Sequence, residues 1–141
     1  MKNALFVVAF IVAAVAPCYG QQPEPHRAEF NAFYANFLAA VRANNKEKLA
    51  DLITFPVEDW SVERKGDVQT GRVKDRADFL ARYELLFTSF MRSHIPHGKL
   101  EALADGRYIL IWHDAGAEFS FEFAYIAGVG YRVSSYTIGP E

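Results

Sequence analysis

The stretch YILIWHDAGAEFSFEFAY, residues 108–125, decides the fold. Large side chains alternate with smaller or polar ones on both sides of Ala115-Gly116. A period of two is typical of strands, and a glycine-containing break between two such runs predicts a hairpin. If the turn pairs Asp114 with Ala117, one face of the hairpin collects rings, and burial of so much apolar surface makes that face the core. The side chains on this face are Tyr108, Leu110, Trp112, Phe119, Phe121, Phe123 and Tyr125.

The same period continues on both sides of the hairpin. We expect four strands, residues 100–104, 107–114, 118–126 and 131–138, separated by glycine-containing breaks and joined as a meander. The loop from Ala127 to Gly130 leaves the register of the last strand open by one residue. That choice decides whether Arg132, Ser134 and Tyr136 all point into the interior or all point out of it.

The first half of the chain is mainly helical in pattern. Apolar residues spaced three and four apart predict helices over residues 26–44 and 46–53, and a long helix over 76–93 that Asp75 caps. Between them, Pro56 suits the start of a strand, so we expect strands over 57–65 and 68–73 around a turn at Lys65-Gly66-Asp67. The two long helices carry aromatic stripes, formed by Phe30, Phe33, Tyr34 and Phe37 and by Phe79, Tyr83, Phe87 and Phe90.

This order of helices and strands is α+β. With two aromatic-rich helices on either side of Phe55-Pro56, it resembles the nuclear transport factor 2-like superfamily, the cystatin-like α+β cone that also includes ketosteroid isomerase and polyketide cyclase relatives. The resemblance covers residues 24–138. It implies a curved antiparallel sheet wrapped around a long helix, with a pocket at the wide end of the cone. It also implies that the outer sheet face forms dimer contacts. Such a resemblance does not by itself assign a function.

The start of the chain predicts export. Lys2 precedes an apolar run of 11 residues, Leu5 to Val15, and the small residues Cys18 and Gly20 suit a cut before Gln21. We therefore expect a signal peptide over 1–20, a mobile lead-in over 21–25 and one domain over 26–141, secreted or periplasmic. The alternative is a lipoprotein acylated at Cys18, although Pro17 departs from the usual lipobox.

Composition excludes several classes of protein. The 141 residues are 51% hydrophobic and carry a formal charge of −2, so no basic excess is present to neutralise phosphates, and we expect no nucleic-acid partner. The single cysteine rules out an intramolecular disulfide framework. The apolar run is too short for a comfortable membrane span, so we expect none to be stable. We expect no cofactor, because glycine-rich phosphate loops and nucleophile motifs are missing from the sequence.

The candidate ligand pocket is the interior of the cone. Its expected lining is Trp60, Tyr83, Tyr108, Trp112 and Tyr136, with Asp59 or Arg132 at the mouth. An interior filled solid by Phe79, Phe87, Trp112 and Phe121 would leave no room for a ligand or a substrate.

The catalytic candidates are weaker and their roles stay open. Tyr83 or Tyr108 could donate a proton in the pocket, and His113 would face Glu118 across the hairpin, where a carboxylate can orient an imidazole. The plainer interpretation of that pair is a polar contact at a hairpin end. His94 and His97 have the spacing of two metal ligands, but Pro96 separates them, so we expect no metal site.

Three functions follow from these features. The leading hypothesis is an exported, non-catalytic domain that binds a small apolar ligand or a protein partner. The first alternative is a pocket enzyme of the isomerase, dehydratase or cyclase type that works by proton transfer. The second is an envelope interaction or immunity protein that uses the outer sheet face. Ile109 and Ile111 on that face also suggest a homodimer.

Overall fold

The computed structural model describes residues 26–141. The segments predicted as a signal peptide over 1–20, with Cys18 and Gly20, and as a lead-in over 21–25 lie outside the described residues. The helices are α1 (Arg27–Arg42), α2 (Lys46–Asp51), α3 (Arg76–Ala81), α4 (Tyr83–Leu86) and α5 (Ser89–His94), followed by the 3-10 helix η1 (Ile95–His97). The strands are β1 (Val57–Arg64), β2 (Asp67–Val73), β3 (Lys99–Ala102), β4 (Tyr108–Asp114), β5 (Ala117–Ile126) and β6 (Gly130–Pro140).

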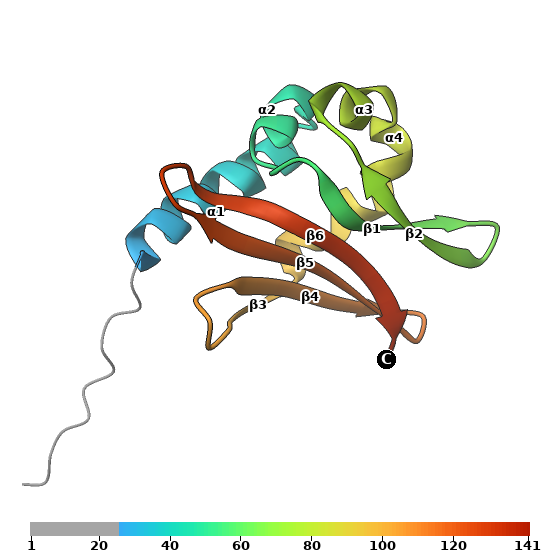
Figure 1. Cartoon of the computed structure of the whole chain (residues 1–141). Helices are drawn as coiled ribbons and strands as arrows, with labels where there is room; N and C mark the ends of the chain where they lie inside the picture. Colours follow the sequence, from blue (N-terminus) through green and yellow to red (C-terminus); the bar gives the residue numbers. More distant parts are fainter. Residues whose placement is uncertain (1–25) are drawn as a thin grey trace, which may run out of the picture.

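The six strands form one curved sheet in the order β2-β1-β6-β5-β4-β3 (Figure 1). Neighbouring strands are antiparallel except β1 and β6, which run parallel and pair at Trp60 and Tyr136. The predicted fold class, an α+β domain with a curved sheet around a long helix, is confirmed. The sheet is mixed, because β1 of the first hairpin pairs with β6 in the parallel direction.

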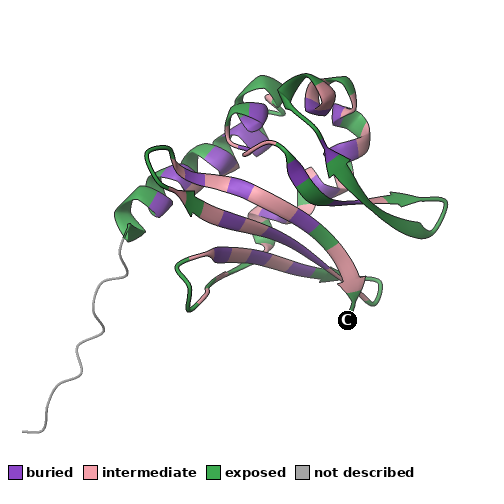
Figure 2. Ribbon diagram, in the orientation of Figure 1, coloured by how far each residue is buried: buried purple, intermediate pink, exposed green. Residues whose placement is uncertain are grey.

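The concave face of the sheet packs against α1, the longest helix. Figure 2 shows buried positions along the sheet and on one side of α1. Phe30 stacks on Tyr108 with ring centroids 3.5 Å apart, and Phe37 meets Phe121 and Phe123 edge-on at 5.9 and 5.3 Å. Edge-on and offset ring contacts of this kind add to the free energy gained from burial. The period of α1 therefore places its aromatic stripe where the meander supplies rings.

The prediction of one continuous helix over residues 76–93 is wrong. It is divided into α3, α4 and α5, with breaks at Arg82 and at Phe87-Thr88. Thr88 caps α5 because its hydroxyl accepts the Met91 N–H at 3.3 Å, and threonine is a favoured helix cap. The carbonyls freed by the break find side-chain donors. Trp60 Nε1 donates to Leu86 O at 2.9 Å, and Arg92 Nη1 donates to Phe87 O at 2.6 Å.

The Asp75 cap predicted before this segment is confirmed. Its side chain accepts the Asp78 N–H at 2.8 Å. Asp78 in turn reaches back to the Lys74 N–H at 2.9 Å and binds Arg82, so both ends of the first turn are tied.

The central hairpin has the predicted register. Asp114 pairs with Ala117, Trp112 with Phe119, Leu110 with Phe121 and Tyr108 with Phe123. The predicted burial of the rings fails only at Tyr125, which lies at the end of β5 and is 37% exposed; its ring stacks on His26 at 3.9 Å.

The last strand follows neither predicted register, because it contains a β-bulge. Glu122 pairs with Ser135, but Phe123 pairs with Val133, so Ser134 is an extra residue. The bulge changes the face on which later side chains lie. Arg132 pairs with Ala124 on the outer face, whereas Tyr136 lies on the inner face with Phe121. No helix within residues 26–141 is long and apolar enough to cross a membrane.

Candidate functional site

The residues predicted to line an interior pocket mostly pack against one another. Trp60, Tyr83, Tyr108, Trp112 and Tyr136 are all buried, with between 1% and 6% of their surface exposed. Trp60 contacts the rings of Phe79, Phe121 and Tyr136, and Trp112 stacks on Phe119 at 5.4 Å. Phe79, Phe87 and Phe121 are also buried, so side chains fill the space expected for the pocket.

A pocket of about 260 Å³ lies where β1 separates from β6. The two strands pair at Trp60 and Tyr136, and one residue further on Ser61 Oγ, rather than a backbone carbonyl, accepts the Ile138 N–H at 3.2 Å. Past this point both strands continue, and the α4–α5 segment closes the pocket from the other side. Its lining is Ser61, Val62, Glu63, Lys65, Leu85, Thr88, Phe90, Met91, Phe119, Tyr136 and Ile138. We call this the β1–β6 pocket.

Tyr136 carries one of the polar groups that line this pocket. The side chain is 2% exposed, and its hydroxyl makes no hydrogen bond within residues 26–141. Across that part of the chain, Trp112 Nε1 is the only side-chain nitrogen or oxygen that is both fully enclosed and without a hydrogen-bond partner. The Tyr136 hydroxyl also has no partner there, so it is not fully enclosed. Since Tyr136 lines the β1–β6 pocket, its hydroxyl opens onto it.

The environment of Tyr136 keeps its hydroxyl protonated. Burial, and secondly the negative charge of Glu63, raise the pKa of Tyr136 well above the usual range of a tyrosine. The hydroxyl is therefore a hydrogen-bond donor over the whole physiological pH range. Two other hydroxyls of the lining accept backbone hydrogen bonds: Ser61 Oγ accepts the Ile138 N–H, and Thr88 Oγ1 accepts the Met91 N–H.

Charge at the pocket is balanced. Glu63 and Lys65 lie at the end of β1 and in the turn that follows, and both line the pocket while remaining exposed. The walls contributed by the helices and by β5 and β6 are largely apolar and include two phenylalanine rings, Phe90 and Phe119. The pocket thus combines apolar walls with polar groups, among them the Tyr136 hydroxyl and one side chain of each charge, Glu63 and Lys65.

The two tyrosines considered as catalytic lie elsewhere. The Tyr83 hydroxyl donates to Asn44 Oδ1 at 2.7 Å, and burial raises the pKa of Tyr83 while the nearby Arg92 lowers it. Tyr108 stacks between Phe30 and the edge of Tyr131. Neither lines the β1–β6 pocket. Their proposed role in proton transfer remains a prediction.

His113 and Glu118 do lie opposite each other, as the register required. His113 Nε2 and Glu118 Oε2 are 3.2 Å apart, and both side chains are more than 40% exposed. The pair belongs to the outer face, at the end of the hairpin and away from the β1–β6 pocket. His94 Nδ1 contacts Phe90 O at 2.8 Å, and His97 is exposed. Within residues 26–141, no three His, Cys, Asp or Glu side chains are grouped to hold a metal ion.

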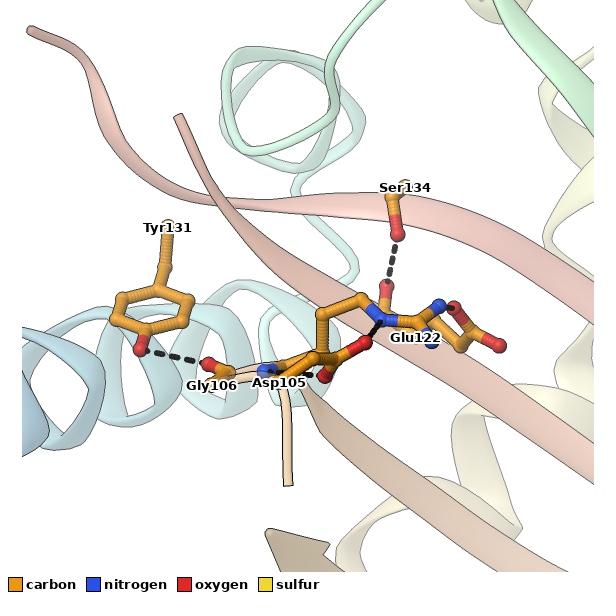
Figure 3. A network of polar contacts seen from close by, with 6 residues as sticks. Asp105, Gly106, Glu122, Tyr131 and Ser134 are labelled. Carbon is orange, nitrogen blue, oxygen red and sulfur yellow. Dashed lines mark hydrogen bonds and ion pairs between the residues drawn. The ribbon is translucent and has the colours of Figure 1, made fainter. Parts of the chain in front are cut away.

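The outer face carries a polar network of its own (Figure 3). Arg107 binds Asp105 at 2.7 Å and also pairs with Glu122. Ser134, the extra residue of the bulge, donates its hydroxyl to Glu122 O at 3.2 Å. From the inner face, Tyr131 donates to Gly106 O at 3.0 Å. The network fastens the β3–β4 turn to β5 and β6, which is a structural role.

Sequence reasoning found Tyr136 but missed most of the pocket lining. Glu63 comes from the first hairpin, whose strands were predicted, whereas Thr88, Phe90 and Met91 come from a helix start inside the segment predicted as one long helix. The signal available in the sequence was Thr88-Ser89, a pair that favours a helix start and so a bend beside β1.

The chain was compared with family models, curated proteins and solved structures. No family model matches this chain, and no curated protein matches it either. Among solved structures it is similar to a "Nuclear transport factor 2 (NTF2-like) superfamily protein from Salmonella enterica subsp. enterica serovar Typhimurium str. LT2". The TM-score is 0.46 and the identity 11%, over 80% of this chain and 89% of that chain.

Proposed function

We propose that this protein binds a small, largely apolar molecule in the β1–β6 pocket. The observation that carries the proposal is the Tyr136 hydroxyl, which is buried with its ring and unpaired within residues 26–141, yet faces a pocket with apolar walls. An unpaired polar group costs free energy in a folded protein, and a bound ligand can recover that cost. The buried rings of Phe79, Phe87 and Phe121 leave neither a ligand nor a substrate room among them, so the proposal rests on the β1–β6 pocket.

Met91 offers a direct test of binding. It lines the pocket, is 3% exposed, and is the chain's methionine besides Met1. Protein purified from cells that express the full chain and labelled with ¹³C at the methionine methyl groups should show a saturable shift of the Met91 signal with toluene. The substitution Val62→Trp should abolish the shift by filling the pocket.

A matched control separates pocket filling from general damage. Leu100→Trp enlarges a side chain that is 36% exposed on the edge strand β3, so it should leave the toluene response unchanged. A Met91 signal that toluene does not move, or a response that survives Val62→Trp, would contradict binding in this pocket.

Two finer parts of the proposal concern the whole protein. We propose export to a secreted or periplasmic location with cleavage after Gly20, supported by the apolar run and small residues at the start of the sequence. The mass of the mature chain tests it, since an N-terminus at Gln21 is expected and a lipid-bearing Cys18 would contradict it. We also propose a homodimer through the outer face of β4, β5 and β6, where half-buried Ile109 and Ile111 lie among charged pairs.

A further inference from the structure

The β1–β6 pocket has the size of a site for a molecule with one ring. Its volume of about 260 Å³ lies just below the roughly 300–1,000 Å³ of pockets that take drug-sized ligands. A dry cavity of roughly 150 Å³ is enough for a benzene molecule in a protein core. The aromatic walls, Phe90 and Phe119, provide ring faces and edges against which a flat ligand can pack.

The polar groups of the pocket select the ligand's substituent. Tyr136 supplies a donor, and the Glu63 carboxylate supplies an acceptor. A ligand hydroxyl satisfies both groups, since it accepts one hydrogen bond and donates another, whereas a ketone or an ether only accepts.

The charges exclude ions as the preferred ligands. Glu63 opposes an anion and Lys65 opposes a cation, and both side chains line the same pocket. An ionised ligand would also lose its hydration on entering apolar walls, which costs much more than transfer of a neutral molecule.

We infer that the pocket recognises a neutral phenol, with the ring between the apolar walls and the phenolic hydroxyl bound between Tyr136 and Glu63. The inference rests on the proposed function of the same pocket and adds the chemical class of its ligand. The raised pKa of Tyr136 supports the donor role, because the hydroxyl does not ionise within the physiological range.

The test compares two probes that differ by one group. p-Cresol and p-xylene have nearly the same shape, but only p-cresol carries a hydroxyl. Dissociation constants come from titrations that follow the Met91 methyl signal in the purified full-chain product. One net hydrogen bond is worth roughly 0.5–1.5 kcal/mol, so p-cresol should bind about 2- to 12-fold more tightly than p-xylene.

Protein variants locate the preference. Tyr136→Phe should reduce the p-cresol preference to about 1-fold while p-xylene still binds, and Glu63→Gln should weaken it by a smaller factor. Tyr125→Phe changes an exposed tyrosine at the end of β5, outside the pocket lining, and should keep the full preference.

The outcomes separate the two proposals. Equal binding of p-cresol and p-xylene to the unchanged protein overturns the phenol inference and supports apolar binding. A preference that persists in Tyr136→Phe overturns the assignment of the donor. Failure of both probes and of toluene to shift the Met91 signal overturns the proposed function itself, and the phenol inference with it.

Discussion

Trp60 and Trp112 are the two tryptophans of the chain, and their indole nitrogens meet different surroundings. Trp60 Nε1 donates to Leu86 O at 2.9 Å, whereas Trp112 Nε1 is enclosed without a partner in the described part of the chain. The unpaired N–H of Trp112 already lowers the stability of the fold. The N–H of Trp60 raises it, because without this donor the buried Leu86 carbonyl would be unpaired.

This difference predicts unequal costs for the same substitution. Trp60→Phe leaves the Leu86 carbonyl unpaired in the core, so the free energy of unfolding should fall by about 1–3 kcal/mol from the hydrogen bond alone, with a further loss from the smaller ring. Trp112→Phe should lower the free energy of unfolding only through the smaller ring, and removal of the unpaired N–H should offset part of that loss. Urea unfolding followed by far-UV circular dichroism measures both, and a larger loss in Trp112→Phe would contradict the assignment.

Asp78 makes stability depend on pH in the acid range. The Arg82 guanidinium, and then the Lys74 N–H, hold the pKa of Asp78 below its usual value. The folded state therefore favours the carboxylate. Its contribution is present above the unfolded pKa, about 3.9, and is lost as pH falls toward the lower folded pKa. Since its side chain is 23% exposed, solvent screens part of the effect.

We expect the free energy of unfolding to decrease below about pH 4, and Asp78→Asn to flatten part of that decrease. Arg82→Met removes the principal partner and should flatten it similarly, while both variants lose stability at neutral pH. Urea titrations at several pH values provide the measurement. An acid slope unchanged in both variants would show that other carboxylates govern it.

At the scale of elements, the turn from η1 into β3 requires a glycine at position 98, because a larger residue would meet the core. A Cβ at Gly98 would lie 2.7 Å from Leu110 Cδ1 and 3.2 Å from Ile111 O. Leu110 is fully buried, so it has little room to move. Gly98→Ala should therefore destabilise the fold by roughly 1–3 kcal/mol through overpacking.

Gly139 and Gly71 are matched controls for that substitution. Both lie in strands, and a Cβ at either position meets no atom within 4 Å. Alanine there should leave the thermal midpoint nearly unchanged or raise it slightly, because alanine restricts the unfolded chain. A Gly98→Ala midpoint equal to that of Gly139→Ala would mean that β3 and β4 separate to admit the methyl group.

The elements also show how far the sequence could predict the fold. The β4–β5 register followed from alternation around Ala115-Gly116, because one face of that hairpin had to collect the rings. The bulge at Ser134 could not be predicted in this way, since an extra residue preserves inward positions for Tyr131, Val133 and Tyr136 while it breaks the strict period of two. The helix break at Phe87-Thr88 could not be recognised, because three short helices here have the same apolar spacing that one continuous helix would have.

The candidate site was less predictable than the fold. The expected lining included Tyr136, which lines the β1–β6 pocket, but the sequence could not distinguish it from Trp60 or Trp112, which pack in the closed core. The distinction depends on where β1 leaves β6, a property of two segments more than 70 residues apart, as the Ser61–Ile138 hydrogen bond shows.

At the scale of the whole molecule, the outer sheet face suits a second copy of the chain. In a two-fold dimer each surface meets itself, so a face with charges of both signs and apolar side chains can be self-complementary. The face of β4 and β5 has these properties. Ile109 and Ile111 are half-buried there, and Glu122 and Glu118 lie beside Arg107 and His113.

Sedimentation velocity at micromolar concentration tests this proposed dimer. The unchanged protein should sediment as a dimer, and Ile111→Glu should sediment as a monomer, because a two-fold interface would bury the new carboxylate near its own symmetry mate without a partner. Val68→Glu, at a 47%-exposed position on β2 at the opposite edge of the sheet, should stay dimeric. A monomer in the unchanged protein would contradict the dimer while leaving the β1–β6 pocket complete within one chain, since every residue of its lining belongs to a single copy.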